Sequence, residues 1–163
     1  SSAASDVYKR QVAEFREGIR HLTRQPLTDE QIDAAWIAML DDVPDYKLDL
    51  LLDLRKRYNT MLLSNTNEIH WDWSEKTCFS YKGHHASDFF NHIYLSYRLH
   101  LLKPDAEIFE YVLQDADIRP EETLFIDDAV PNCRTAESLG FHTYTPQPRE
   151  DWSHLFGIMN HKS

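Results

Sequence analysis

The chain has 163 residues, 42% of them hydrophobic and 27% charged, which is the size and composition of one globular domain. Its formal net charge of −10 argues against nucleic acid as a partner, because phosphate backbones are bound by patches of Lys and Arg. The sequence contains neither an apolar run of about 18 residues, as a membrane span requires, nor the pattern of a secretory signal. We therefore expect a cytoplasmic protein that binds neither nucleic acid nor membranes.

The cysteines and histidines do not suggest a metal or redox centre. Cys78 and Cys133 lie far apart in the sequence, and we expect both to be reduced thiols. None of the histidine spacings matches a zinc site, and the stretch that holds His84, His85 and His92 is largely polar. Surface positions are therefore expected for these three histidines.

The first residues of the chain form a segment of their own. Residues 1–11 contain no starting Met and no hydrophobic pattern, and they resemble the translated sequencing-adapter tails of fragmentary gene models. We interpret them as a non-native tail and leave them out of the fold prediction; the alternative is an ordinary disordered terminus. On our interpretation the natural protein continues upstream, and this chain is a fragment.

Two helices are predicted within residues 12–44, one over 12–25 and one over 29–42. Apolar residues repeat at helical spacing in both. A capping box formed by Thr28 and Gln31 marks the start of the second helix. We expect the two helices to form an antiparallel hairpin, which would be a small module separate from the rest of the chain.

From residue 45 onward, strand patterns alternate with helix patterns. Strands are predicted at 60–65, 92–97, 123–128 and 142–145, and helices around 48–54, at 68–78, near Ser87, after Pro104, at 131–139 and at 151–156. Such alternation produces βαβ units and a parallel sheet covered by helices on both faces. The sequence therefore predicts a Rossmann-like, three-layer α/β fold for residues 45–163.

Two adjacent carboxylates, Asp127 and Asp128, end the short apolar run of the strand predicted at 123–128. Ligands in open α/β sheets bind outside the carboxyl ends of the strands, so this is where chemistry is expected. Two neighbouring carboxylates repel each other unless a cation holds them, and oxygen ligands of this kind suit Mg²⁺. The alternative is that the pair only caps the helix that follows.

Two other strand ends carry polar residues that complement this pair. Ser64 and Asn65 follow one strand, and Lys103 follows another. Phosphoryl transfer needs hydrogen-bond donors for the phosphoryl oxygens, positive charge, and Mg²⁺ held by carboxylates. The three strand ends together supply such a set.

Three motifs carry a resemblance to a known family: Leu-Leu-Ser-Asn-Thr-Asn at 62–67, Leu-Lys-Pro-Asp-x-x-Ile-Phe at 102–109, and Phe-Ile-Asp-Asp-x-x-x-Asn at 125–132. In this order and spacing the chain resembles the haloacid dehalogenase superfamily, over about residues 12–156. It is most similar to phosphatase-like members with a helical cap. The resemblance implies a partial cap at 12–44 and a catalytic core at 45–163. The implied activity is Mg²⁺-dependent hydrolysis of a small phosphorylated metabolite through an aspartyl-phosphate.

The resemblance also implies a role for each motif residue. Ser64 would bind a phosphoryl oxygen, helped by the backbone of Asn65, and Lys103 would neutralise the phosphoryl group. Asp128 would bind Mg²⁺ directly, and Asp127 would do so directly or through water. Asn132 would support their loop. From the residues alone, Ser64 remains open to being a turn residue, and Lys103 to being a solvated charge before a helix.

The chain departs from the family pattern at the nucleophile. The resemblance implies an Asp-x-Asp motif after a first, central strand, but the only Asp-x-Asp here is Asp115-Ala116-Asp117, at the end of a helix pattern. We therefore expect that strand to be missing and a gap to lie between the strands at 60–65 and 123–128. On this basis the chain would fold only marginally and would lack phosphatase turnover.

A second departure is His100, at a position that is often Gly in the family.

Two other functions are weighed against the phosphatase. One is a 2-haloacid dehalogenase, whose metal-free site has no use for paired carboxylates. The other is a non-catalytic binding or regulatory protein of the same fold, which never had the nucleophile.

Overall fold

The computed structural model describes residues 34–37 and 43–157. Five strands form one parallel sheet in the order β3-β2-β1-β4-β5. They are β1 (Ala34–Ile37), β2 (Asn59–Ser64), β3 (His92–Leu95), β4 (Thr123–Ile126) and β5 (His142–Tyr144). The predicted parallel α/β sheet is thereby confirmed.

The helices lie between successive strands, as the alternating pattern predicts. The α-helices are α2 (Asp45–Arg57), α3 (Glu68–Thr77), α4 (Ala86–Phe89), α5 (Ser96–Leu99), α6 (Ala106–Ala116) and α7 (Val130–Ser138). Three short 3₁₀ helices are η1 (Tyr81–Gly83), η2 (Pro120–Glu122) and η3 (Ser153–Phe156). In the part of the chain that the structure describes, no helix is long and apolar enough to cross a bilayer.

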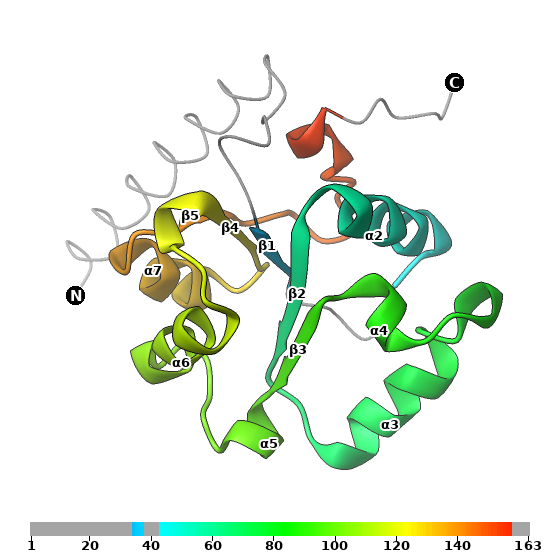
Figure 1. Ribbon diagram of the computed structural model, residues 1–163, viewed down its shortest axis with the longest axis horizontal. Helices are drawn as coiled ribbons and strands as arrows, with labels where there is room; N and C mark the ends of the chain where they lie inside the picture. Colours follow the sequence, from blue (N-terminus) through cyan, green and yellow to red (C-terminus); the bar gives the residue numbers. More distant parts are fainter. Residues whose placement is uncertain (1–33, 38–42, 158–163) are drawn as a thin grey trace.

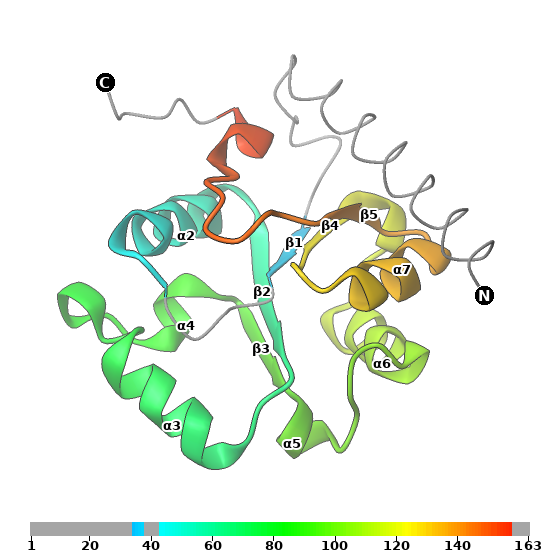
Figure 2. The same ribbon diagram turned by 180° about the vertical axis from the view of Figure 1, so that it is seen from behind.

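Helices cover both faces of the sheet, which gives three layers. Figures 1 and 2 show α2, α3 and α4 on one side of the strands and α6 and α7 on the other. Neighbouring strand residues serve opposite faces: Leu62 packs in the core with α2 and α3, whereas Leu63 packs in the core with α6 and α7. This alternation follows from the two-residue period of a strand, and both faces are apolar because both are covered.

The central position of the sheet is occupied by β1, which pairs in parallel with β2 on one side and with β4 on the other. Two expectations are therefore wrong: residues 34–37 are not helical, and no gap separates the strands at 60–65 and 123–128. A short apolar run such as Ala-Ala-Trp-Ile suits a helix face and a fully buried strand equally well, and periodicity cannot separate the two. With the gap filled, the reason for expecting marginal folding no longer holds. The rest of the predicted hairpin lies outside the described residues.

A smaller difference concerns the end of β3. The strand predicted at 92–97 stops at Leu95, and α5 begins at Ser96. Ser96 Oγ accepts a hydrogen bond from the backbone N–H of Thr66 and donates one to its carbonyl oxygen. The Ser96 side chain thus binds the loop after β2 where a longer strand would have continued the ladder.

The strand order reverses between β1 and β4. From β1 the sheet extends through β2 to β3 on one side, and through β4 to β5 on the other. Crevices at such a reversal, outside the carboxyl ends of the strands, are the usual ligand sites of open α/β sheets. Asp127 and Asp128 directly follow β4 and therefore lie at this edge.

Candidate active site

Asp127 is the buried centre of the site, with 2% of its surface exposed. Its Oδ1 accepts a hydrogen bond from the backbone N–H of Ala129 at 2.8 Å. Its Oδ2 accepts one from Asn132 Nδ2 at 2.8 Å and one from Lys103 Nζ at 3.0 Å. The loop after β4 and the first turn of α7 are thus organised around one carboxylate.

Lys103 is a buried cation, not a solvated charge. Only 8% of its surface is exposed, and its Nζ also donates a hydrogen bond to the carbonyl oxygen of Leu63 at 3.0 Å. A buried charge is tolerated only when it is paired and hydrogen-bonded, and Asp127 supplies the opposite charge. An ammonium group has three donors, so two contacts leave one for a ligand.

The Asn65 side chain joins the first two motifs. Its Nδ2 donates to the backbone carbonyl oxygen of Lys103 at 2.9 Å, and its Oδ1 accepts from the backbone N–H of the same residue at 3.0 Å. The expectation concerned only the backbone of Asn65. The structure shows that the Asn65 side chain also binds the backbone of Lys103. The sequence does not reveal this contact, because the two residues are 38 positions apart.

Ser64 is the last residue of β2 and is half-buried. Among the described residues, its hydroxyl has no hydrogen-bond partner. It lies next to Leu63, whose carbonyl oxygen holds the Lys103 ammonium. A hydroxyl and an ammonium donor are therefore supplied by adjacent parts of the sheet edge, as the phosphate-binding roles require.

Asp128 is exposed, in contrast to its neighbour. Partial burial of its carboxyl, with the charge of Asp127 beside it, raises the pKa of Asp128 above the ordinary value, and Lys103 counteracts this only in part. A cation bound near Asp128 would stabilise the charged form of this carboxyl group.

The donor set fits Mg²⁺. In the described ranges no group of three or more His, Cys, Asp or Glu side chains could enclose a metal ion. Mg²⁺ does not need such a cage, because it is usually bound by one or two carboxylates together with water and phosphate oxygens. Asp128, whose carboxyl is the more exposed of the two, could serve as a direct ligand. The oxygens of Asp127 already accept three hydrogen bonds, which favours contact through water.

The interpretation of Asp115 and Asp117 as helix-end residues is confirmed. Asp115 lies in the last turn of α6, and its Oδ2 accepts a hydrogen bond from the Tyr94 hydroxyl at 2.7 Å. Asp117 is the C-cap of that helix, in the left-handed conformation. Neither residue ends a strand, so neither is in the place of a nucleophile.

His100 also has a left-handed backbone, with φ of 56° and ψ of 34°. Glycine adopts this conformation without steric cost, whereas a residue with a Cβ is strained in it. This explains why a small residue suits the position.

Cys78 and Cys133 are both free cysteines, as expected. Burial raises the pKa of the Cys133 thiol to about 12, so the thiol stays protonated at neutral pH.

Sequence reasoning missed Lys47, in the first turn of α2. Its ammonium lies 5.3 Å from the centre of the Trp152 ring. Burial lowers the pKa of Lys47, while the charges of Asp151, Glu150 and Asp128 act in the opposite direction. No motif in the sequence marks this lysine, because its neighbours come from the far end of the chain.

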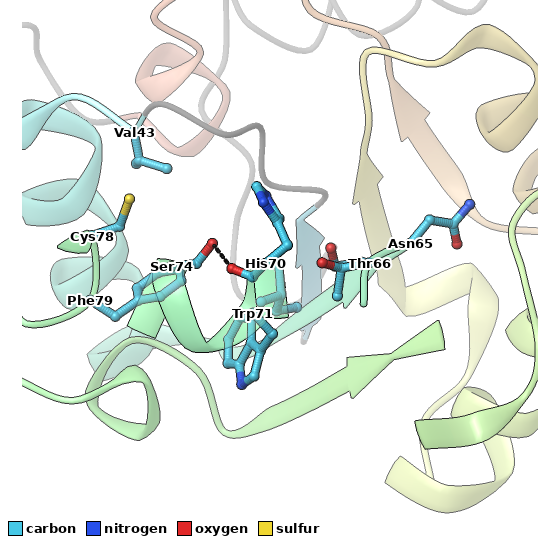
Figure 3. A pocket seen from close by; sticks show the side chains of 10 residues that line it. Val43, Asn65, Thr66, His70, Trp71, Ser74, Cys78 and Phe79 are labelled. Carbon is cyan, nitrogen blue, oxygen red and sulfur yellow. Dashed lines mark hydrogen bonds between the residues drawn. The ribbon is translucent and has the colours of Figure 1, made fainter. Parts of the chain in front are cut away.

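A pocket of about 80 Å³ opens beside the end of β2. Its polar lining includes Ser64, Thr66, His70 and Ser74, and its apolar lining includes Val43 and Trp71. Figure 3 shows the His70 ring between Val43 and Thr66, pointing away from the Trp71 indole. Asn65 also lines the pocket, although its carboxamide points away from these side chains, toward the Lys103 loop.

Sequence comparison identifies relatives of this arrangement. A family model for haloacid dehalogenase-like hydrolases matches residues 3–140, a range that includes most of the segment 1–11 set aside above. A D-ribitol-5-phosphate phosphatase of Bacteroides thetaiotaomicron is 40% identical over 139 residues, which cover 85% of this chain and 68% of that protein. A sesquiterpene phosphatase of Aspergillus oryzae is 37% identical over 107 residues, or 60% of this chain and 47% of that protein.

Solved structures agree with the sequence relatives. A haloacid dehalogenase family enzyme of Bacteroides thetaiotaomicron, crystallised with magnesium and inorganic phosphate, matches with a TM-score of 0.69 and 48% identity. The match covers 88% of this chain and 73% of that one. The expectations of a phosphatase-like member and of Mg²⁺ as the cofactor are confirmed at the level of these relatives. The chain belongs to the haloacid dehalogenase-like hydrolase family.

Proposed function

We propose that this protein is a phosphatase that hydrolyses a small phosphate monoester with Mg²⁺ as its cofactor. The main support for the proposal is the pair of hydrogen bonds made by the Lys103 ammonium. It donates one to the Leu63 carbonyl oxygen at the end of β2 and one to the Asp127 carboxylate in the loop after β4. This contact brings the hydroxyl of Ser64 and the carboxylates to one edge of the sheet. The phosphatase relatives support the same function.

Each residue has a defined task in this proposal. Ser64 Oγ and the backbone N–H groups that follow it would donate to phosphoryl oxygens, and Lys103 would offset their charge through its remaining donor. Asp128 would hold Mg²⁺, with Asp127 contacting it through water and Asn132 fixing the orientation of Asp127. Mg²⁺, when bound, would polarise a phosphoryl oxygen and neutralise the charge that develops on it.

In the family pattern, the covalent step through an aspartyl-phosphate uses an Asp that follows the central strand. In the described part of the chain that strand is β1, Ala34–Ile37, which contains no carboxylate. We therefore propose that the chain as it stands binds phosphate and Mg²⁺ without turnover. Because β1 lies at the centre of the sheet, the predicted boundary at 44 does not separate cap from core, and we further propose that only the part of 12–44 before β1 belongs to a cap. We also propose that β1 and residues 45–163 form the core, and that the protein acts on a phosphorylated metabolite in the cytoplasm.

Two other functions remain outcomes of the test. A non-catalytic binding or regulatory protein would share the same sheet edge and never have had the nucleophile. A 2-haloacid dehalogenase is less well supported, because its site has no use for the Asp127–Asp128 pair. The dehalogenase structures that match this chain are about 20% identical and therefore speak to the fold alone.

Sequencing the 5′ end of the gene from source DNA is the first test. An upstream, in-frame apolar strand that ends in Asp-x-Asp would support the phosphatase, whereas a genuine start codon near residue 12 would favour the binding protein. The second test is product release by the protein so extended. Mg²⁺-dependent phosphate release that is lost in Lys103→Met supports the proposal. Halide release from 2-chloropropionate without added metal would overturn it in favour of the dehalogenase.

A further inference from the structure

Lys47 carries its charge at the same edge of the sheet as the Asp127–Asp128 pair. It lies in the first turn of α2, which joins the parallel strands β1 and β2 and therefore begins at their carboxyl edge. The start of α2, the end of β4 and the C-terminal segment share one core cluster, which includes Leu48, Ile126 and Trp152. Figures 1 and 2 show the C-terminal segment, drawn in orange and red, alongside α2. The Lys47 side chain thus starts close to the loop after β4.

A buried tryptophan holds the Lys47 ammonium in place. The Nζ atom lies 5.3 Å from the centre of the Trp152 ring, and a cation in this position is attracted to the face of the indole. Only 2% of the Trp152 surface is exposed, and its ring packs against that of Phe156 with centroids 6.1 Å apart. The charge therefore has a fixed platform that belongs to the core of the molecule.

The Lys47 ammonium has three donors that the fold leaves unused. Of residues 34–37 and 43–157, none forms a hydrogen bond or an ion pair with it. The charges of Asp151, Glu150 and Asp128 act on it from a longer range. They raise the pKa of Lys47 by less than half-burial lowers it, so these carboxylates do not fully offset the cost of burying its charge.

The carboxylates of the C-terminal segment already have other donors. Glu150 accepts a hydrogen bond from the Tyr144 hydroxyl through Oε2 and one from the backbone N–H of Gln147 through Oε1. Asp151 Oδ1 accepts one from the backbone N–H of Ser153 at 3.0 Å. Neither residue is therefore the ion-pair partner that would give Lys47 a purely structural role.

The third of these carboxylates, Asp128, belongs to the candidate active site. The Lys103 charge also acts on it, so two positive charges influence the place where Mg²⁺ and a phosphate would meet. An anion bound there is attracted by both lysines, whereas a cation bound there is repelled by both.

We propose that Lys47 is the second cation of the phosphate site, which strengthens binding of the phosphate anion and weakens binding of Mg²⁺ to Asp128 while no anion is present. The inference rests on the proposed function, because it requires that Asp128 binds Mg²⁺ and that Ser64 and Lys103 bind phosphate. Lys47 acts here through its charge, and it belongs to α2, which lies outside the three sequence motifs.

Two calorimetric titrations of Lys47→Met test the proposal without requiring turnover. One adds inorganic phosphate in the presence of Mg²⁺, and the other adds Mg²⁺ alone, both at an ionic strength of about 0.01 M, where screening is weak. The variant should bind phosphate about threefold more weakly and Mg²⁺ alone about threefold more tightly. This is the effect of one charge on a divalent ion about 10 Å away in water.

Matched variants separate the charge from the side chain. Lys47→Arg keeps the charge and should bind both ligands as wild type does. Lys56→Met makes the same change in the last turn of α2, where the lysine is exposed at the other edge of the sheet, and it should leave both affinities unchanged. Lys47→Gln repeats the test with another neutral side chain, and circular dichroism identifies any variant that fails to fold.

The direction of the two changes decides the outcome. Weaker phosphate binding together with tighter Mg²⁺ binding supports the proposal, because a merely structural role of Lys47 would weaken both. Weakening of both in Lys47→Met and Lys47→Gln would overturn it. If the wild-type chain binds both ligands and neither variant alters them, this inference is overturned and the phosphatase proposal stands. If the wild-type chain binds neither ligand, both proposals are overturned.

Discussion

The carboxamide of Asn65 makes two hydrogen bonds with the backbone of Lys103, one donated at 2.9 Å and one accepted at 3.0 Å. This pairing resembles one rung of a β-ladder, with a side chain in place of a strand. It fixes the loop after α5 against the end of β2. The position of the Lys103 ammonium therefore depends on Asn65 as well as on its partner Asp127.

Replacing Asn65 with Ala should separate the two motifs. Loss of both hydrogen bonds should lower the free energy of unfolding by about 1–2 kcal/mol and weaken inorganic phosphate binding, because Lys103 loses its fixed position. Asn91→Ala is the matched control, since Asn91 Oδ1 accepts a similar hydrogen bond from the Thr60 N–H near the opposite end of β2. Urea unfolding and calorimetric titration should show both losses for Asn65→Ala and only the stability loss for Asn91→Ala.

The buried ion pair between Lys103 and Asp127 predicts a coupling between two substitutions. Lys103→Met leaves the Asp127 carboxylate buried without its cation and should destabilise the chain by about 3–5 kcal/mol. The double variant Lys103→Met with Asp127→Asn removes both charges and should recover part of that loss. Additive losses in urea unfolding would show that the pair does not interact as the 3.0 Å contact indicates.

Asp128 predicts a pH dependence of stability. Burial and the neighbouring Asp127 charge raise the pKa of Asp128, so the folded chain holds this proton more tightly than the unfolded chain does. The free energy of unfolding should therefore fall as pH rises from the ordinary carboxyl pKa through the raised one. Without Mg²⁺, Asp128→Asn should be more stable than wild type at about pH 7, and this advantage should vanish at about pH 3.

Added Mg²⁺ should make wild type more stable than Asp128→Asn at neutral pH, the reverse of the order expected without the ion. At about ten times its dissociation constant, a ligand that binds only the folded state adds about 1.4 kcal/mol. Wild type should gain this amount in urea unfolding at neutral pH, and Asp128→Asn should gain nothing. Equal stabilisation of both proteins by Mg²⁺ would place the ion elsewhere.

His100→Gly should stabilise the chain. The left-handed conformation strains a residue with a Cβ by about 1–2 kcal/mol, and the extra freedom of Gly in the unfolded chain offsets about half of this. A net gain of about 0.5–1 kcal/mol is expected. Glu110→Gly, in the exposed middle of α6, should instead lose about 1 kcal/mol. A loss for His100→Gly in thermal unfolding would contradict the conformational explanation.

Sequence patterns were sufficient for the elements with strong local signals. β4 could be predicted because its apolar run is uninterrupted, and α6 because Pro104 and four periodic apolar residues mark it. The order of motifs along the chain was enough to bring Ser64, Lys103 and Asp127 to one edge, because parallel strands end on the same side of a sheet.

The failures came where local signals are ambiguous or absent. Residues 34–37 (Ala-Ala-Trp-Ile) are all apolar, so the sequence shows no alternation that would distinguish a strand from a helix. Only the pairing of this segment with β2 and β4 identifies it as a strand. The Asn65 bridge and the environment of Lys47 depend on residues far away in sequence. Nothing in the sequence distinguishes the buried role of Asp127 from the exposed role of Asp128, although the two are adjacent.

The most direct test of the account is a crystal structure of this chain with Mg²⁺ and inorganic phosphate. The account predicts Mg²⁺ bound to a carboxylate oxygen of Asp128, and a phosphate that accepts hydrogen bonds from Ser64 Oγ and Lys103 Nζ. A phosphate bound away from these two donors, or Mg²⁺ without contact to Asp128, would contradict it.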